Sequence, residues 1–408
     1  STSLTTMDGG FVGLLDLKKD ASIGVDGQTI LLRTNDFLGI SGIETGCFHL
    51  ISVRSQPNAN IAVGFILCDD APMVRKYDPQ TEEVSSQTVD DPTQQNLLEQ
   101  IRMGQVPLGS VLKYGDIVSQ QQMQQWKDQT NFILDSGILS KRGLHHGDKV
   151  IPGSFNGGDD DNNNTSAQQS GSSSTIDGKS VIYPSIPVVD VSLSLRTHQH
   201  AGMRRYLAGL SPSERTQLFM EPNIAGRLLR DILSLHFDND WKTLLGDLQL
   251  AYVLFLYLQC LASLEHWKDL VAMLSLVDPL TMQAFPNLYQ SFMEILLSQI
   301  SSMDKGFLEE VDEAGNNFLV PSLQHLCRNL TKTTIVSDES LLQFERLLSN
   351  KFPSMLQVHD PMDDDDDDDD NESNNDDGRY HKRLGRGGDS LQDDDDDDDG
   401  SDGPVVVE

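Results

Sequence analysis

The stretch of residues 360–408 limits most strongly what this chain can fold into. It holds 22 aspartates and glutamates against 4 lysines and arginines, with unbroken aspartate runs at 363–370 and 393–399. Such a segment buries too little apolar surface to offset the chain entropy that is lost on ordering. We therefore predict a disordered acidic tail over residues 358–408, so that a folded core has to come from the residues before it.

Three consecutive valines, Val405, Val406 and Val407, stand at the end of this tail. β-Branched residues favour strands, and the tail offers them no core to join. Their expected use is to add a strand to the sheet edge of a partner, where backbone hydrogen bonds give affinity and alternate side chains give specificity. The alternative interpretation is a frayed terminus.

The charge outside the tail is modest. The tail accounts for 18 of the formal net charge of −33, and no basic stripe is present to neutralise phosphates, which argues against direct binding of nucleic acid. The four cysteines are scattered without a C-x-x-C pair, and residues 1–10 lack the basic and apolar regions of a secretory signal. We therefore expect reduced thiols and a location in the cytoplasm and nucleus.

Residues 1–151 predict a β-rich N-terminal domain that ends in helices. Apolar runs separated by Gly, Asn and Asp indicate strands, and residues 69–72 are expected to join the strands at 61–68 and 73–77 as a hairpin. From residue 92 onward the pattern becomes helical, at 94–103 and 118–134. Residues 152–185, rich in Gly, Asn, Asp and Ser, predict a flexible linker, and residues 186–199 a returning strand.

Residues 200–357 predict an all-helical domain. Ser211 and Glu214 form a capping box, and Ser337 is the expected cap of the last helix. The run at 250–264 is apolar on every face, but it is short for a bilayer and is interrupted by Gln259, so a helix buried in the core explains it better. The fold class is thus α+β, with two domains and the acidic tail.

A search for catalytic chemistry finds no G-x-S-x-G turn, no glycine-rich phosphate loop, no H-E-x-x-H and no paired-cysteine metal site. The adjacent His145 and His146 point apart and indicate loop polarity rather than a metal site. His49 in a strand and His266 in a helix are expected to be structural. The sequence therefore predicts no catalytic, cofactor-binding or metal-binding residues, and a protein that is not an enzyme.

Residues 245–276 resemble the characteristic helix of the AAR-two splicing-factor homologue family, in the Leu-Gly-Asp-Leu-Gln that starts at Leu245 and the Glu-His-Trp-Lys that starts at Glu265. Shorter pieces agree in order, at residues 37–40, 46–50, 64–67 and 130–133, and Pro-Val-Val-Val-Glu at the end resembles the C-terminal element of the family. Members of the family assist assembly of the U5 snRNP.

This resemblance implies a non-catalytic protein with a β-rich and an all-helical domain. It implies binding to the central U5 scaffold, pre-mRNA-processing factor eight, near its RNase H-like and Jab/MPN domains, which delays joining of the U5 helicase. In the family the tail bridges these two domains as an added strand, so Val405, Val406 and Val407 are the expected partner contacts. The stripe of Leu264, Trp267, Val271 and Leu274 places Trp267 in the core instead.

Two other functions stay open on sequence grounds. The first is an acidic-tailed chaperone for basic proteins such as histones, in which the aspartate runs bind by bulk electrostatics and the valines play no part. The second is a hydrolase with an unrecognised site, which a pocket holding a strongly perturbed acid or base would support.

Overall fold

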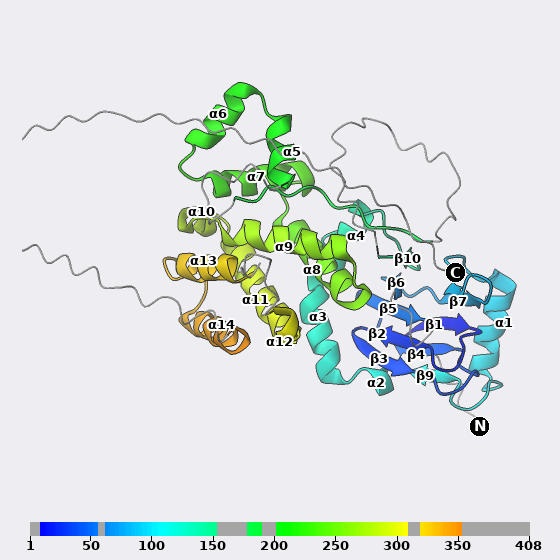
Figure 1. The fold of residues 1–408 in the computed structure, drawn as a ribbon. Helices are drawn as coiled ribbons and strands as arrows, with labels where there is room; N and C mark the ends of the chain where they lie inside the picture. Colours follow the sequence, from blue (N-terminus) through cyan, green and yellow to red (C-terminus); the bar gives the residue numbers. More distant parts are fainter. Residues whose placement is uncertain (1–8, 56–61, 153–177, 190–200, 309–318, 353–408) are drawn as a thin grey trace, which may run out of the picture. The chain divides into compact units, whose positions relative to one another are not determined.

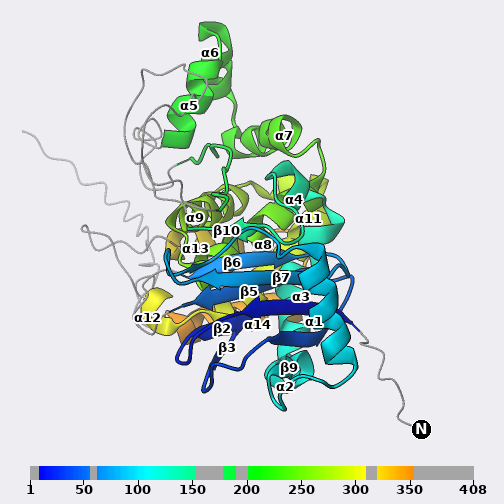
Figure 2. The ribbon, with the colours of Figure 1, turned by 90° about the vertical axis from the view of Figure 1, so that its right-hand side faces the viewer.

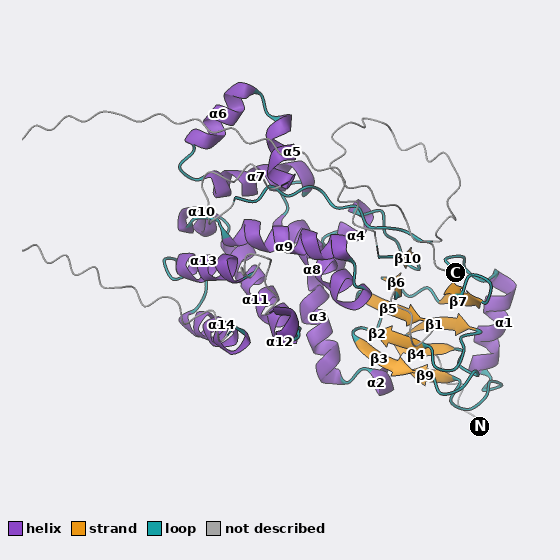
Figure 3. Cartoon of the chain, in the orientation of Figure 1, coloured by secondary structure: helices purple, strands orange, loops and turns teal. Residues whose placement is uncertain are grey.

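A computed structural model describes residues 9–55, 62–152, 178–189, 201–308 and 319–352 (Figure 1). All of these residues belong to one compact unit, residues 1–358. The strands precede residue 151 and the segment from residue 201 onward is helical, which confirms the α+β class and the order of its two halves. Figure 3 shows the strands gathered at one end of this unit and most of the helices at the other.

The strands form two five-stranded sheets. Sheet A has the order β8 (Glu83–Val84), β7 (Met73–Asp78), β1 (Gly10–Leu15), β4 (Gly39–Ile43) and β9 (Val111–Lys113). Sheet B has the order β10 (Lys149–Val150), β6 (Val63–Leu67), β5 (His49–Arg54), β2 (Ser22–Val25) and β3 (Gln28–Leu31). Pairing within sheet B is antiparallel, whereas in sheet A β1 pairs in parallel with β7, as β4 does with β9.

The two sheets enclose an apolar core, to which β1 contributes Val12 and Leu14 and β6 contributes Phe65. The outer face of sheet A packs through Phe11 on Leu97 of α1 (Asp91–Arg102). Strand side chains alternate between the two faces of a sheet, so the residues of sheet B that do not point into this core face the helices. The N-terminal half is therefore a sandwich covered by helices on both sides.

The predicted hairpin at residues 69–72 is wrong. β6 lies in sheet B, while β7 lies in sheet A beside β1, so this turn carries the chain from one sheet to the other. The turn residues indicated a change of direction correctly. They could not indicate which strand β7 would pair with. That pairing depends on burying side chains on both faces of β7, such as Met73, Val74 and Tyr77.

Three helices complete the N-terminal half: α2 (Tyr114–Ile117), α3 (Gln120–Asp135) and α4 (Ile138–Lys141). α3 begins at a capping box in which the Ser119 hydroxyl accepts from the Gln122 N–H and the Gln122 side chain accepts from the Ser119 N–H. This helix crosses from the sheets to the helical half, where it packs on α8.

The helical half consists of ten described helices: α5 (Ala201–Gly209), α6 (Pro212–Met220), α7 (Ile224–His236), α8 (Trp241–Leu258), α9 (Leu261–Ser275), α10 (Pro279–Ala284), α11 (Pro286–Ser302), α12 (Lys305–Leu308), α13 (Val320–Leu330) and α14 (Asp338–Lys351). The predicted capping box of Ser211 and Glu214 starts α6, and Ser337 caps α14. Both predictions are confirmed. Figure 2 shows α5, α6 and α7 at one end of this unit.

The family-like helix at residues 245–276 is two helices rather than one. Gln259 adopts a left-handed conformation, with φ of 58°, and its N–H bonds to the last turn of α8, which ends that helix before α9 begins. α8 and α9 then pack against each other. Nearly every side chain of α8 from Thr243 to Phe255 is buried, which confirms the core interpretation of this run. Within the described segments we find no helix with the length and apolarity to cross a bilayer.

Residues 178–185 belong to the predicted linker, but in the structure the segment 178–189 packs against the rest of the unit. Lys179 forms a bridge to Val150, and Val181 and Ile186 are buried in the main core. Apolar residues spaced along a Ser- and Gly-rich segment account for this difference. Residues 186–189 are not in a strand, and the rest of the predicted returning strand lies outside the described residues.

Candidate functional site

The three valines proposed as partner contacts, Val405, Val406 and Val407, lie outside the described residues, so their role stays a prediction. Within the described residues, the candidates for chemistry are the histidines and the acids beside them.

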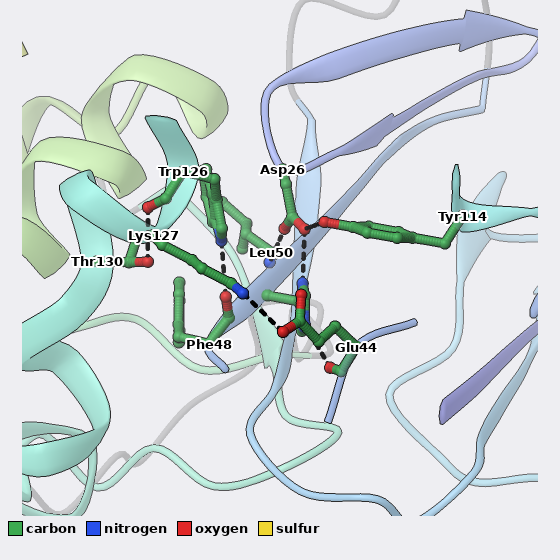
Figure 4. Close-up of polar contacts among 9 residues, drawn as sticks. Asp26, Glu44, Phe48, Leu50, Tyr114, Trp126, Lys127 and Thr130 are labelled. Atoms are coloured by element: carbon green, nitrogen blue, oxygen red, sulfur yellow. Dashed lines mark hydrogen bonds and ion pairs between the residues drawn. The ribbon is translucent and has the colours of Figure 1, made fainter. Parts of the chain in front are cut away.

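His49 is the first residue of β5, the middle strand of sheet B, and belongs to a closed polar cluster around Asp26 (Figure 4). Asp26 and Gly27 form the two-residue turn between β2 and β3, with φ of 49° and 82°, which aims the Asp26 carboxylate inward. That carboxylate accepts hydrogen bonds from His49 Nδ1 at 2.5 Å, from the Tyr114 hydroxyl at 2.7 Å and from the Leu50 N–H at 3.0 Å. Three donors therefore converge on this one carboxylate.

His49 carries a proton on both nitrogens in this arrangement. Its Nε2 donates to the Glu44 carbonyl oxygen at 2.7 Å, while Nδ1 faces the Asp26 carboxylate. Burial alone would lower the pKa of His49, but the charge and hydrogen bond of Asp26 and the Glu44 carbonyl raise it above its usual value. With no nitrogen left for a substrate, His49 is structural and cannot act as a general base in this state.

The same cluster attaches α3 to the sheet. Trp126 Nε1 donates to the Phe48 carbonyl at 2.6 Å, and Lys127 pairs with Glu44 at 2.6 Å (Figure 4). The hydrogen bond to Glu44 raises the pKa of Lys127, and this effect outweighs burial, which would lower it. The family-like residues 46–50 thus lie at the joint between sheet B and α3.

A second closed cluster surrounds Asp247 of α8, which is fully buried. Arg142 forms two hydrogen bonds to its carboxylate, at 2.7 and 2.5 Å, and His266 Nε2 of α9 donates at 2.6 Å. Burial would raise the pKa of Asp247, but His266 and Arg142 together lower it below its usual value. Tyr183, from the packed segment 178–189, stacks on His266 with ring centroids 4.2 Å apart.

α8 approaches α3 closely at Gly246. A Cβ there would meet the Phe132 carbonyl oxygen at 2.8 Å, so only glycine permits this approach. One turn later, Gln249 accepts from the Phe132 N–H at 2.8 Å and donates to Asn131 Oδ1 at 2.7 Å. The family-like residues 130–133 and 245–249 therefore meet each other, in an interface that holds the two halves together.

Trp267 is fully buried, and its indole N–H donates to Gln299 Oε1 at 2.9 Å, which confirms its core assignment. His146 Nδ1 accepts from the N–H groups of Cys68 and Asp69 at 3.2 Å, so this histidine orders the turn between the sheets. Among the described residues no three histidine, cysteine or acidic side chains are grouped to hold a metal ion. All four cysteines carry free thiols.

A groove of about 1110 Å³ lies between α3, α11 and α14. Carboxamides and hydroxyls dominate its lining, including Gln121, Gln125, Asn131, Ser298, Gln343 and Asn350. A smaller apolar pocket of about 250 Å³ lies at the break between α8 and α9, beside Leu261 and Met303.

Sequence reasoning identified His49 and His266 but missed Asp26 and Asp247, which give them their roles. A signal was present in each case. Asp26 opens an Asp-Gly pair, the strongest short signal for a two-residue hairpin, and Asp247 interrupts an otherwise apolar helix. A charge within a fully apolar helix predicts a buried partner, because an isolated buried carboxylate is very costly.

Two family models match this chain, one in each half. Residues 8–142 match the AAR2 N-terminal domain, and residues 200–356 match the AAR2 C-terminal repeat region. A Caenorhabditis elegans protein called Protein AAR2 homolog is 30% identical over 129 residues, covering 31% of this chain and 34% of the relative. The mouse protein of the same name is 32% identical over 117 residues, 29% of each chain. The aligned part thus spans about a third of these curated relatives.

Proposed function

This chain belongs to the AAR2 family, and from that premise we propose that it is a non-catalytic pre-mRNA splicing factor. Its partner is the central scaffold protein of the U5 snRNP, pre-mRNA-processing factor eight. The observation that carries the proposal is the match of both folded halves, in order, to models of one family. The proposed role is that of an assembly chaperone that occupies the scaffold and delays joining of the helicase, in the cytoplasm and nucleus.

The geometry of the described residues supports a binding role. Both ring nitrogens of His49 are engaged, by Asp26 and Glu44, while Nε2 of His266 donates to Asp247 and its ring stacks on Tyr183. The His49 cluster fixes α3 on sheet B, and the Asp247 cluster holds the N-terminal half against the helical half through Arg142. A unit held in this way can present fixed surfaces to a partner, and fixed surfaces lose little conformational entropy on binding.

In the proposed mechanism, Val405, Val406 and Val407 add a strand to the scaffold while the folded unit binds beside it. A flexible chain of the length of residues 363–403 spans roughly 35 Å, and repulsion between aspartates lengthens such a chain. This reach allows the strand to engage the Jab/MPN domain while the folded unit holds the RNase H-like domain. The tethered strand raises affinity through its effective concentration, without tight binding of its own.

The test is a pull-down with the C-terminal domains of the scaffold, comparing the full chain with a version that ends at Gly403. Each lost ladder bond is worth about 0.5–1.5 kcal/mol, so removing the strand should weaken binding about tenfold or more. Equal affinity of the two versions would remove the tail from the mechanism. No binding by either version would reject the proposed partner itself.

The rival function, an acidic-tailed chaperone for basic proteins such as histones, is favoured by the 22 acidic residues among residues 360–408. Replacing the aspartates at 363–370 and 393–399 by asparagines separates the two, because it removes 15 of the 22 acidic charges in the tail and leaves the valines in place. Strand addition should survive this change and a few hundred millimolar salt, whereas polyacid binding should be lost under both conditions. Binding of histones that depends on these aspartates would support the rival.

A further inference from the structure

The helices α5, α6 and α7, residues 201–236, form a small subdomain that we call the arm. Its own core is separate from the main core and contains Met203, Leu207, Leu218 and Leu228. Both views place α5 and α6 beyond α7, at one end of the unit (Figures 1 and 2). Leu218 is the one buried residue of α6, so this helix depends mainly on its capping box and turns most of its surface to solvent.

The arm is basic in an acidic protein. It carries five arginines against three acidic residues, while the chain as a whole carries −33. Two of the acids are engaged within the arm, because Glu214 closes the capping box of α6 and Asp231 accepts from the Tyr206 hydroxyl at 2.5 Å. Arg204, Arg205, Arg215 and Arg230 are exposed. The charge that the arm offers to a partner is therefore positive.

Large apolar side chains are also exposed on the arm. Met220 is 79% exposed and Phe219 is 45% exposed, side by side at the end of α6, and Leu235 of α7 is 65% exposed. The apolar side chains that α7 buries are instead Leu228, Leu229, Ile232 and Leu233. Single exposed leucines are ordinary, whereas exposed apolar side chains together with exposed arginines on one small subdomain favour an interaction surface.

We propose that the arm is a docking surface for an acidic polypeptide segment that carries a large apolar side chain. The arginines supply charge complementarity and orientation, and Met220 with Phe219 supplies the apolar contact. A nucleic acid fits less well, since a net charge of +2 neutralises few phosphates and gains nothing from an exposed methionine. The proposal is independent of the scaffold and of the tail valines.

The experiment is a selection of random twelve-residue peptides on the full chain, with counter-selection on the double variant Met220→Ser, Arg230→Glu. Peptides that survive should be net negative and carry at least one leucine, methionine or aromatic residue. Binding of such a peptide should weaken about tenfold in Met220→Ser and about threefold in Arg230→Glu, with the second loss reduced at high salt.

A matched double variant, Leu280→Ser with Lys332→Glu, makes the same chemical changes at exposed sites outside the arm, where Leu280 is 77% exposed. This control should keep full affinity. Circular dichroism should show both double variants as folded as the parent chain, because neither removes a buried side chain. Selected peptides that are neutral or basic, peptides that bind the arm variant equally well, or tight binding of a single-stranded RNA through the arm would each overturn the proposal.

Discussion

The interface between the two halves and the arm are built in opposite ways. At the interface, α3 packs on α8, and the buried Asp247 is matched by Arg142 of the N-terminal half and by His266 of α9. The arm has a core of four buried apolar side chains, and it leaves arginines and methionine in water. The difference separates a region that fixes the relative position of two halves from a region that is free to meet another molecule.

The comparison also explains where the family-like residues lie. Residues 130–133 and 245–249 meet at this interface, through Phe132 and Gln249, while residues 46–50 join sheet B to α3 through Phe48. These positions therefore report how the unit is held together. They do not by themselves identify the surface that a partner touches.

The largest effect is expected for Asp247→Ala. The change leaves Arg142 and His266 buried without their shared carboxylate, which typically costs about 3–5 kcal/mol in the free energy of unfolding. Chemical denaturation of the full chain measures it. Glu265→Ala on the neighbouring helix removes only a half-exposed pair with Lys268 and should cost under about 0.5 kcal/mol. Similar losses in the two variants would show that the buried cluster does not stabilise the interface.

The next effect concerns the close approach of α8 to α3. In Gly246→Ala the new Cβ would lie 2.8 Å from the Phe132 carbonyl oxygen, so the helices must shift, at a cost of about 1–3 kcal/mol. Gly115→Ala in α2 is the control, because nothing lies within 4 Å of its Cβ position and the helical backbone accepts alanine. Thermal unfolding of the two variants compares them. An unchanged midpoint for Gly246→Ala would contradict the packing described here.

A smaller effect follows from the raised pKa of His49. The folded protein keeps this proton at a pH where the unfolded chain has released it, so the contribution is complete below the unfolded pKa near 6.5. It is lost as pH rises through the folded pKa. Above pH 6.5 the free energy of unfolding should therefore fall with rising pH in the parent chain and stay flatter in His49→Gln. Parallel pH profiles would show that Asp26 does not hold the proton on His49.

The smallest global effect is expected in the arm. Ser211→Ala removes the cap of α6, typically worth about 1 kcal/mol, but this helix buries only Leu218. Amide exchange of residues 212–220 should therefore speed up several-fold while exchange in α8 is unchanged. Equal acceleration in α6 and α8 would mean that the arm unfolds together with the core, which would contradict the difference between the arm and the interface.

Much of this architecture could be predicted from the sequence. Alternating and helical apolar patterns gave the halves, the capping serines gave the starts of α6 and α14, and the composition of 250–264 gave the buried centre. Each of these depends on local physics. The sheet that accepts β7, the left-handed Gln259 that divides α8 from α9, and the docking of residues 178–189 depend on contacts far apart in the chain, which single-sequence patterns do not report.

The candidate sites divide in the same manner. His49 and His266 were correctly expected to be structural, because each lies in a regular element with apolar neighbours. Their partners Asp26 and Asp247 lie 23 and 19 residues away, and only the fold brings them together. The tail valines remain a prediction that rests on resemblance and on chain entropy.

We propose that this protein acts sterically, by occupying a binding site on its partner. Its folded unit stays unchanged, and its last valines form a strand on the partner. Hydrogen exchange of the full chain, free and bound to the C-terminal domains of the U5 scaffold, tests it most directly. The account predicts new protection at Val406 and Val407 on binding, with exchange in α3 and α8 unchanged. Equal exchange at the valines in the free and bound forms, while the complex is otherwise intact, would contradict it.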